Sequence, residues 1–412
     1  MNLSILRNHI LLSALFVATS ASMLCGQEDG TVTAAVAEAP VNAVAVEAVE
    51  AAEKVPTIEV CFVLDTTGSM SGLIQGAKDK IWSIANELSS TTPAPKIQFG
   101  LIGYRDRRDD YITTVNDLTD DLDAMHTKLM AFSAGGGGDT PESVNQSLHE
   151  AVTKMSWSND DEVLKIIFLV GDAPPHMDYD EVQYPEICDL AMKKDLVINT
   201  IQCGSMSATT PIWQAIAAKS EGSYTAILQS GGVVAIKTPH DKEIAVLNAE
   251  LNGTVINYGS AMDRKENQMK IDNNLASKAE AIADRAGFYS KARSGPSGSG
   301  SHGRAGKVIG GENDLIEQVM NDEIKLSEVD KSKLPTELQG LSLEEQKVLI
   351  DQKVSDRKML QEKIDVLVKK RSKFIEAEKA KAAVDGEFDS FDMEVKKMIR
   401  AQGESKGIKF SK

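Results

Sequence analysis

Runs of apolar residues alternate along the chain with segments in which apolar residues recur every three or four positions. The strongly apolar runs, typical of buried strands, are residues 58–64, 97–103, 163–170 and 197–202. The segments with helical spacing are residues 72–88, 142–156, 184–194 and 210–219. Residues 111–116 predict a short antiparallel edge strand, and residues 223–228 predict a weaker sixth strand. This alternation predicts an α/β fold with a doubly wound, mostly parallel six-stranded sheet that helices cover on both faces.

The pattern becomes helical after residue 236. Residues 241–253 form an amphipathic segment that ends at a glycine, and we expect this helix to be the last one that flanks the sheet. Helical spacing continues from 262 to 293, and a run rich in Ser and Gly follows it. Ser342 and Glu345 form a capping box, which predicts the start of a long charged helix that runs to about residue 383.

The apolar positions of this long helix approach a heptad seam, the pattern of a coiled coil. The seam positions are Ile350, Leu360, Ile364, Leu367 and Phe374. Arg357 and Arg371 fall on the same seam and weaken a coiled-coil assignment. Two interpretations therefore remain open: the helix packs on another helix or loosely on a second copy of itself, or it stands alone in solvent. Residues 384–412 are polar and are expected to fray.

The first residues have the pattern of a targeting signal. Arg7 precedes the apolar run 10–18, and small residues follow at 19–22, which is typical of a secretory signal peptide and too short for a convincing membrane span. Residues 27–55 are rich in Ala, Val and Glu and predict a low-complexity tether, with a helix over 44–54 as the alternative. We therefore expect the protein to be exported, to the periplasm, the cell surface or the medium.

Four cysteines are present, and the first of them lies beside the signal. Leu24 is bulky where a lipidation motif has a small residue, so a membrane is expected as a partner only if Cys25 is lipidated. Cys61, Cys188 and Cys203 are expected to be buried thiols, and export leaves a Cys188–Cys203 disulfide as the alternative. No Cys or His spacing indicates zinc.

These patterns divide the 412 residues into six parts. They are a signal peptide (1–25), a low-complexity tether (26–55), the sheet domain (56–255), a helical extension (256–293), a flexible linker (294–306) and a helical C-terminal region (307–412). The formal net charge of -16 disfavours nucleic acid and anionic membrane surfaces as partners.

Oxygen-bearing side chains gather in three loops of the predicted sheet domain. The first strand runs into a turn that places Asp65, Thr67 and Ser69 at alternate positions, which supplies half of the oxygen shell of a hard divalent cation. Thr140, in a later glycine-rich loop, is the candidate fourth ligand. Asp172, at the tip of another buried strand, is the fifth. All five fall just after a strand or at a helix start, which is where open α/β sheets bind ligands.

The order of these residues resembles the metal-ion-dependent adhesion site (MIDAS) of the von Willebrand factor A (VWA) family, which reads Asp-x-Ser/Thr-x-Ser, then a distant Thr, then a distant Asp. Asp65, Thr67, Ser69, Thr140 and Asp172 match those positions one by one. The resemblance covers about residues 56 to 235. It implies a site for Mg2+, with Mn2+ or Ca2+ as alternatives, whose last coordination position accepts a carboxylate from a protein partner.

Other chemistries fit the same loops less well. The glycines at 135–138 are not followed by a Lys at the spacing of a phosphate-binding loop, so nucleotide binding is not expected. The turn at Asp65 resembles half of an aspartic protease site, but no second copy occurs. His176 follows Asp172 on the same loop and would suit a metal-dependent hydrolase, yet no nucleophile or second base accompanies it.

The resulting hypothesis is an exported, bacterial-type VWA protein of the cell envelope, adhesion-type and not an enzyme. Its divalent cation would bridge to an acidic group of a protein partner. The alternative is an envelope scaffold or assembly factor that acts through its C-terminal helices, and a metal-dependent hydrolase is the least favoured of the three.

Overall fold

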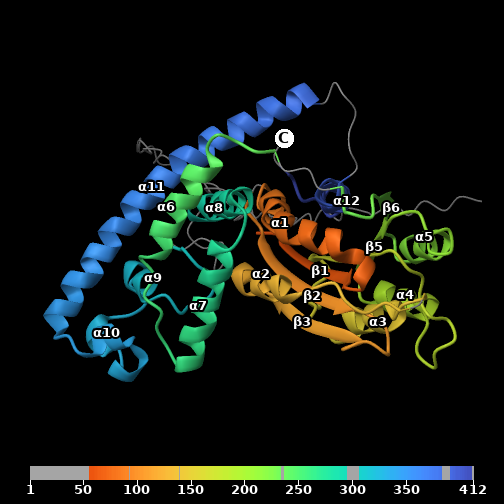
Figure 1. Ribbon diagram of the computed structural model, residues 1–412, viewed down its shortest axis with the longest axis horizontal. Helices are drawn as coiled ribbons and strands as arrows, with labels where there is room; N and C mark the ends of the chain where they lie inside the picture. Colours follow the sequence, from red (N-terminus) through yellow and green to blue (C-terminus); the bar gives the residue numbers. More distant parts are fainter. Residues whose placement is uncertain are drawn as a thin grey trace, which may run out of the picture. The chain divides into compact units, whose positions relative to one another are not determined.

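The four apolar runs of the sequence and the two weaker predicted strands form a six-stranded sheet (Figure 1). Its strands are β1 (Thr57–Asp65), β2 (Lys96–Tyr104), β3 (Thr113–Thr119), β4 (Leu164–Gly171), β5 (Leu196–Cys203) and β6 (Tyr224–Ile227). Their order is β3-β2-β1-β4-β5-β6, with β3 antiparallel to β2 and the other neighbours parallel. Strands β1 and β4 are buried almost throughout, because helices cover both faces of a parallel sheet. The predicted fold class is confirmed.

The computed structural model describes residues 55–91, 93–138, 140–232, 236–294, 306–382 and 390–410. The predicted signal peptide lies outside these residues, as do Cys25, the tether up to residue 54, and the linker from 295 to 305. Within the described residues, we find no helix with the length and apolar character needed to cross a membrane.

Helices pack on both faces of the sheet (Figure 1). The first face carries α1 (Ser71–Leu88), α2 (Leu122–Ala131) and α12 (Phe391–Ser405), and their buried side chains share one core cluster with β1, β2 and β4. The opposite face carries α3 (Val144–Thr153), α4 (Tyr184–Lys193) and α5 (Thr210–Lys219). Helix α2 was not predicted from the sequence pattern, whereas the other sheet-covering helices before residue 236 form where their spacing predicts them.

Helix α12 belongs to the core of the sheet domain although it follows β6 by more than 160 residues in the chain. Phe391, Val395 and Ile399 are buried in the same cluster as the strands, and the Phe391 ring lies 6.2 Å from the ring of Phe62 in β1. Their spacing of four residues places them on one helix face. The expectation that the tail frays is therefore wrong for residues 390–410, because an apolar stripe lies hidden in a polar segment.

The remaining helices form a second layer, built on α8. They are α6 (Asp241–Asn252), α7 (Ala261–Leu275), α8 (Ala279–Ser294), α9 (Leu315–Met320), α10 (Thr336–Gln339) and α11 (Leu343–Ala382), with short 3-10 turns at Leu326–Glu328 and Lys331–Lys333. A further 3-10 turn, Gly68–Met70, lies between β1 and α1. Helix α6 packs against α8 and α11, and its core cluster contains no strand residue. The expectation that α6 flanks the sheet is wrong, because α8 and α12 take the places beside α1.

The seam of α11 packs on these neighbouring helices, which answers the question that the sequence left open. Ile364 and Leu360 are buried in the cluster shared with α6 and α8. The two arginines on the seam are buried as well: Arg357 Nη1 lies 2.6 Å from Asp314, and Arg371 lies 2.7 Å from Asp241 and from Asp284. Each charge thus has a buried partner, as burial of a guanidinium requires.

Residues 53–412 form one compact unit, and the predicted division of that stretch into domains stays a prediction.

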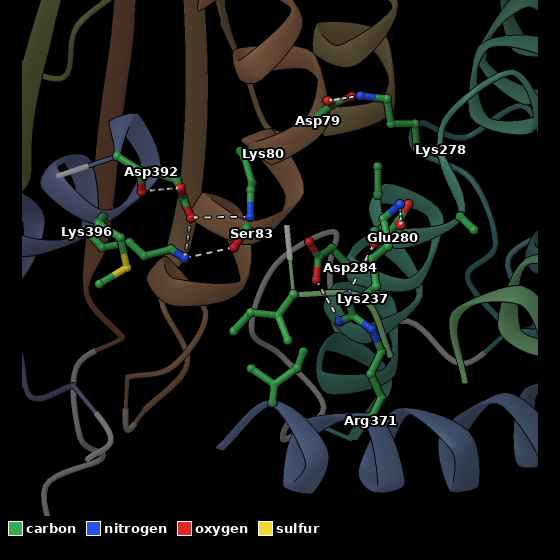
Figure 2. Close-up of a pocket in the computed structure, with 16 residues that line it drawn as sticks. Asp79, Lys80, Ser83, Lys237, Lys278, Glu280, Asp284, Arg371, Asp392 and Lys396 are labelled. Atoms are coloured by element: carbon green, nitrogen blue, oxygen red, sulfur yellow. Dashed lines mark hydrogen bonds and ion pairs between the residues drawn. The ribbon is translucent and has the colours of Figure 1, made fainter. Parts of the chain in front are cut away.

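Charged side chains join α12 and α8 to α1 around a cavity of about 500 Å3 (Figure 2). Lys396 of α12 donates to Ser83 of α1 at 2.8 Å and pairs with Asp392 at 3.2 Å. Lys278, directly before α8, pairs with Asp79 of α1 at 2.5 Å. These contacts connect α1 with α12 and with the residue before α8. We therefore interpret the cavity as part of the interface that holds the three helices together.

The cysteines of the described residues carry free thiols. Cys61, Cys188 and Cys203 are fully buried, and burial raises the pKa of each thiol. The Cys188–Cys203 disulfide, the alternative from the sequence, is not formed. Cys188 instead donates to the backbone carbonyl of Ile216 at 3.7 Å.

Because His126 of α2 is buried, the free energy of unfolding depends on pH. The pKa of His126 is lowered to about 4, mainly by burial; the charge of Asp123 opposes this shift, and the charges of Arg285 and Lys78 add to it. Above the pKa of the unfolded state, about 6.5, such a histidine leaves the free energy of unfolding independent of pH. The free energy of unfolding decreases as the pH falls from about 6.5 towards the pKa of the folded state. We expect the wild type to lose about 2 kcal/mol more than His126→Phe between pH 7.5 and pH 5, measured by urea unfolding. Equal losses in the two proteins would contradict this.

Candidate functional site

The register of the sheet brings two of the predicted site residues to one edge. Strands β1 and β4 are parallel neighbours, with Leu64 opposite Val170. Asp65 ends β1, and Asp172 follows the last residue of β4. Both carboxylates therefore leave the carboxyl edge of the sheet from adjacent strands, which is the position where open α/β sheets place their ligands.

The turn after β1 holds its oxygen atoms by internal hydrogen bonds. Asp65 Oδ1 accepts from the Thr67 backbone N–H at 2.8 Å and from Thr67 Oγ1 at 2.6 Å. Thr67 Oγ1 lies 3.3 Å from Ser69 Oγ. Asp65 is fully buried, and its second oxygen, Oδ2, has no hydrogen-bond partner among the described residues. An unpaired buried carboxylate oxygen is costly, so this atom marks a place where a cation would be stabilised.

The glycine-rich loop lies directly over this turn. Gly68 N–H donates to Gly136 O at 3.3 Å, and Gly135 N–H donates to Thr66 O at 3.1 Å. Gly137 has a φ of 73°, and a Cβ there would lie only 3.0 Å from the Cβ of Thr67. The close approach and the left-handed backbone explain why glycine occupies this position.

Thr140 and Glu142 follow that loop and differ in burial. Thr140 is exposed and precedes a cis peptide bond to Pro141, and among the described residues no hydrogen bond joins it to the other four predicted ligands. Glu142 is 3% exposed, and its Oε2 has no hydrogen-bond partner in the described part of the chain. The backbone of Glu142 is fixed by bonds to the loop after β4, at Pro174 O and at the N–H of His176. Thr140 stays a predicted ligand. Glu142 lies at the site as well, although the sequence did not predict it as a ligand.

Burial and neighbouring carboxylates raise the pKa of Asp65 and of Glu142. The pKa of Asp65 is raised to about 7, mainly by burial; hydrogen bonds from Thr67 oppose the rise, and Asp172 contributes to it. Burial, followed by the charges of Asp65, Asp106, Asp109 and Asp172, raises the pKa of Glu142 to about 9. Neighbouring like charges make the ionised forms unfavourable, and a bound cation reverses this effect.

These donors fit a hard divalent cation. The turn offers a carboxylate and two hydroxyls, and Asp172 adds a second carboxylate, all of them oxygen ligands that Mg2+, Mn2+ and Ca2+ prefer. The described residues contain no group of three His, Cys, Asp or Glu side chains arranged to hold a metal. A shell at this site would therefore depend on hydroxyl groups and water as well as on carboxylates.

His176 is held inside the loop after β4. Its Nδ1 lies 2.8 Å from Asp178 Oδ1, its Nε2 lies 3.6 Å from Asp106 Oδ2, and its ring stacks on Tyr179 with centroids 3.8 Å apart. Asp106 in turn accepts from Ser143 Oγ at 2.9 Å. These contacts join the turn after β2 to the loops that carry Glu142 and Asp172, so His176 has a structural role in assembling the site.

Part of the chain is similar to a known protein family. Residues 59–240 match the family model of the von Willebrand factor A domain. A protein of Acanthamoeba polyphaga mimivirus, named as ariadne-like RING finger protein R811, is 29% identical over 119 residues. The aligned region is 29% of this chain and 11% of the length of that relative.

Solved structures with some similarity are the proximal thread matrix protein 1 of the mussel byssus and the SpRpn10 VWA domain. The mussel protein, in a form with a zinc-occupied MIDAS motif, is 17% identical with a TM-score of 0.33, over 42% of each chain. The SpRpn10 domain is 15% identical with a TM-score of 0.33, over 43% of this chain and 89% of that domain. The zinc ion is a property of the mussel protein.

Proposed function

We propose that this protein binds a protein partner through a divalent cation held at the carboxyl edge of the sheet. Asp65, Thr67, Ser69, Thr140 and Asp172 would hold the ion, with Mg2+ the first candidate and Mn2+ or Ca2+ the alternatives. The observation that carries the proposal is the buried Asp65 carboxylate, whose Oδ2 has no hydrogen-bond partner among the described residues. When bound, the cation supplies a positive centre that attracts an acidic side chain of the partner.

The residues of the chain contribute to this binding in three ways. The hydrogen bonds from Thr67 fix Asp65 Oδ1 and leave Oδ2 for the ion. Ser69 is exposed, so the site opens to the surface at this residue. With two carboxylates and neutral hydroxyls as ligands, a divalent site keeps affinity for a further carboxylate from outside. Export to the cell envelope is part of the proposal and is supported by the signal-like pattern of residues 1–25.

Calorimetric titration of the purified protein with Mg2+ and with Mn2+ tests the site. We expect saturable binding by the wild type and an affinity at least about 100-fold lower in Asp65→Ala, because loss of a direct ligand exceeds the effect of losing a supporting one. Asp351→Ala, at an exposed carboxylate of α11, is the matched control and should bind like the wild type. Equal heats in the wild type and Asp65→Ala would reject the site.

The partner is tested by capture from an envelope extract with and without a chelator. We expect a protein that is retained in Mg2+, released by the chelator, and absent with Asp65→Ala. If the partner protein is retained equally in the presence of the chelator and by Asp65→Ala, bridging by a cation is contradicted.

A further inference from the structure

The segment after β6 lies against the candidate metal site although no motif distinguishes it. It comprises Leu228–Gly232, and Gly231 N–H donates to Leu228 O at 2.8 Å to form a turn. Gly231 and Gly232 have φ values of 82° and 61°, which permit the turn without strain. The turn directs the side chain of Gln229 at the loop that carries Asp172.

Gln229 contacts two of the predicted ligand residues. Its Nε2 donates to Asp172 Oδ2 at 2.7 Å and approaches the backbone carbonyl of Ser69 at 3.4 Å. The other end of the amide lies against Gly204, where a Cβ would come within 2.3 Å of Gln229 Oε1. One side chain therefore spans the loops after β1, β4 and β5.

The segment that carries Gln229 is itself fixed to the helices. The N–H of Phe391, the first residue of α12, donates to Gly231 O at 2.9 Å. Ser230 sits so close to α1 that a Cβ on Gly72 would lie 2.9 Å from Ser230 Cα. Gln229 thus extends from a short segment anchored at the starts of α1 and α12, although its own side chain is exposed.

We propose that Gln229 is a positioning residue for Asp172. Its amide binds one oxygen of the Asp172 carboxylate and so fixes the direction in which the carboxylate faces Asp65. The proposal rests on the proposed metal site. Partners that orient a metal ligand by hydrogen bonding commonly change metal affinity by 10- to 100-fold when they are removed, and we expect about tenfold here because Gln229 is exposed.

The first test is Mg2+ affinity in Gln229→Met, which keeps the length of the side chain and removes its hydrogen bonds. The matched control is Gln75→Met, because Gln75 of α1 also donates to a carboxylate, Asp79 at 2.9 Å, at an exposed position. We expect about tenfold weaker binding in Gln229→Met and unchanged binding in Gln75→Met. Equal affinity in Gln229→Met and the wild type overturns the positioning role.

The second test needs no metal. In protein labelled with 15N at glutamine, the side-chain amide resonance of Gln229 is the one absent from the spectrum of Gln229→Met. We expect it to shift when Asp172→Ala removes its acceptor and to stay in place in Asp351→Ala. A resonance that does not move in Asp172→Ala overturns the contact. If the wild type binds no Mg2+ while this resonance moves, the metal site fails and Gln229 merely orders the loop, so the two failures are distinguishable.

Discussion

A chain that ends at residue 389 is expected to lose the cooperative folding of its sheet domain. The deletion removes α12 and the residues after it, whose buried apolar side chains are Phe391, Val395, Met398, Ile399 and Ile408. At about 2 kcal/mol for each buried side chain, the loss is about 10 kcal/mol, as large as the whole stability of a typical domain. The deletion also exposes the apolar faces of α1 and β1 that α12 covers.

Urea unfolding followed by circular dichroism measures this effect. Phe391→Ala, a milder version, should cost about 3–5 kcal/mol, whereas Lys397→Ala on the exposed face of α12 should change stability by less than about 0.5 kcal/mol. The side chain of Lys397 is 76% exposed, which makes it a control on the same helix. A truncated chain that unfolds cooperatively at the wild-type urea concentration would show that α12 is dispensable.

This packing changes how the scaffold alternative can be tested. Deleting residues 307–412 would remove α12 from the core together with the helices proposed to act as a scaffold, so loss of partner capture after that deletion would not tell the two hypotheses apart. Point substitutions on exposed positions of α11 separate them, because Val348 is 71% exposed and its replacement leaves the core intact. Loss of capture in Val348→Asp with Mg2+ binding unchanged would favour the scaffold hypothesis.

The centre of the sheet was predictable from the sequence because β1, β2, β4 and β5 are continuous apolar runs bounded by turn residues. Helix α12 was not, because only one face of it is apolar and its partners are far away in the chain: Lys396 bonds to Ser83, 313 residues distant. For α11 the difficulty was different. From the sequence, Arg357 and Arg371 are expected at the surface. They are buried because they pair with Asp314, Asp241 and Asp284, and the sequence does not predict these ion pairs.

Some residues of the candidate site were likewise predictable from the sequence, and others were not. The turn at Asp65, Thr67 and Ser69 is local, so its spacing alone predicts that the oxygens converge. Glu142 lies two residues after Thr140 and was visible as a second acidic residue of its loop, but only its burial marks it as part of the site. Gln229 carries no signal in the sequence, because its role depends on how a turn after β6 is held by α12.

Asp123→Ala is expected to destabilise the protein by about 3–5 kcal/mol, because it leaves a buried guanidinium without its counter-charge. Asp123 accepts from Arg285 Nε and Nη2 at 2.7 Å each, from Tyr289 Oη at 2.7 Å and from Gly310 N–H at 2.8 Å. These groups join α2 to α8 and to the segment after residue 306. Burial alone would raise the pKa of Asp123, but the charge and hydrogen bonds of Arg285 hold it below its usual range.

The sign of the pH dependence follows from that shift. A carboxyl whose pKa is lowered in the folded state contributes its full stability above the unfolded pKa, near 4, and loses it as the pH falls through the folded pKa. The wild type and Asp123→Ala are therefore compared at neutral pH. Glu328→Ala, at an exposed pair with Lys325, should cost less than about 1 kcal/mol. Asp123→Leu combined with Arg285→Met should recover much of the loss, because a buried apolar pair needs no counter-charge. If Asp123→Ala costs no more than Glu328→Ala in urea unfolding at pH 7, the buried pair does not hold the two layers of helices together.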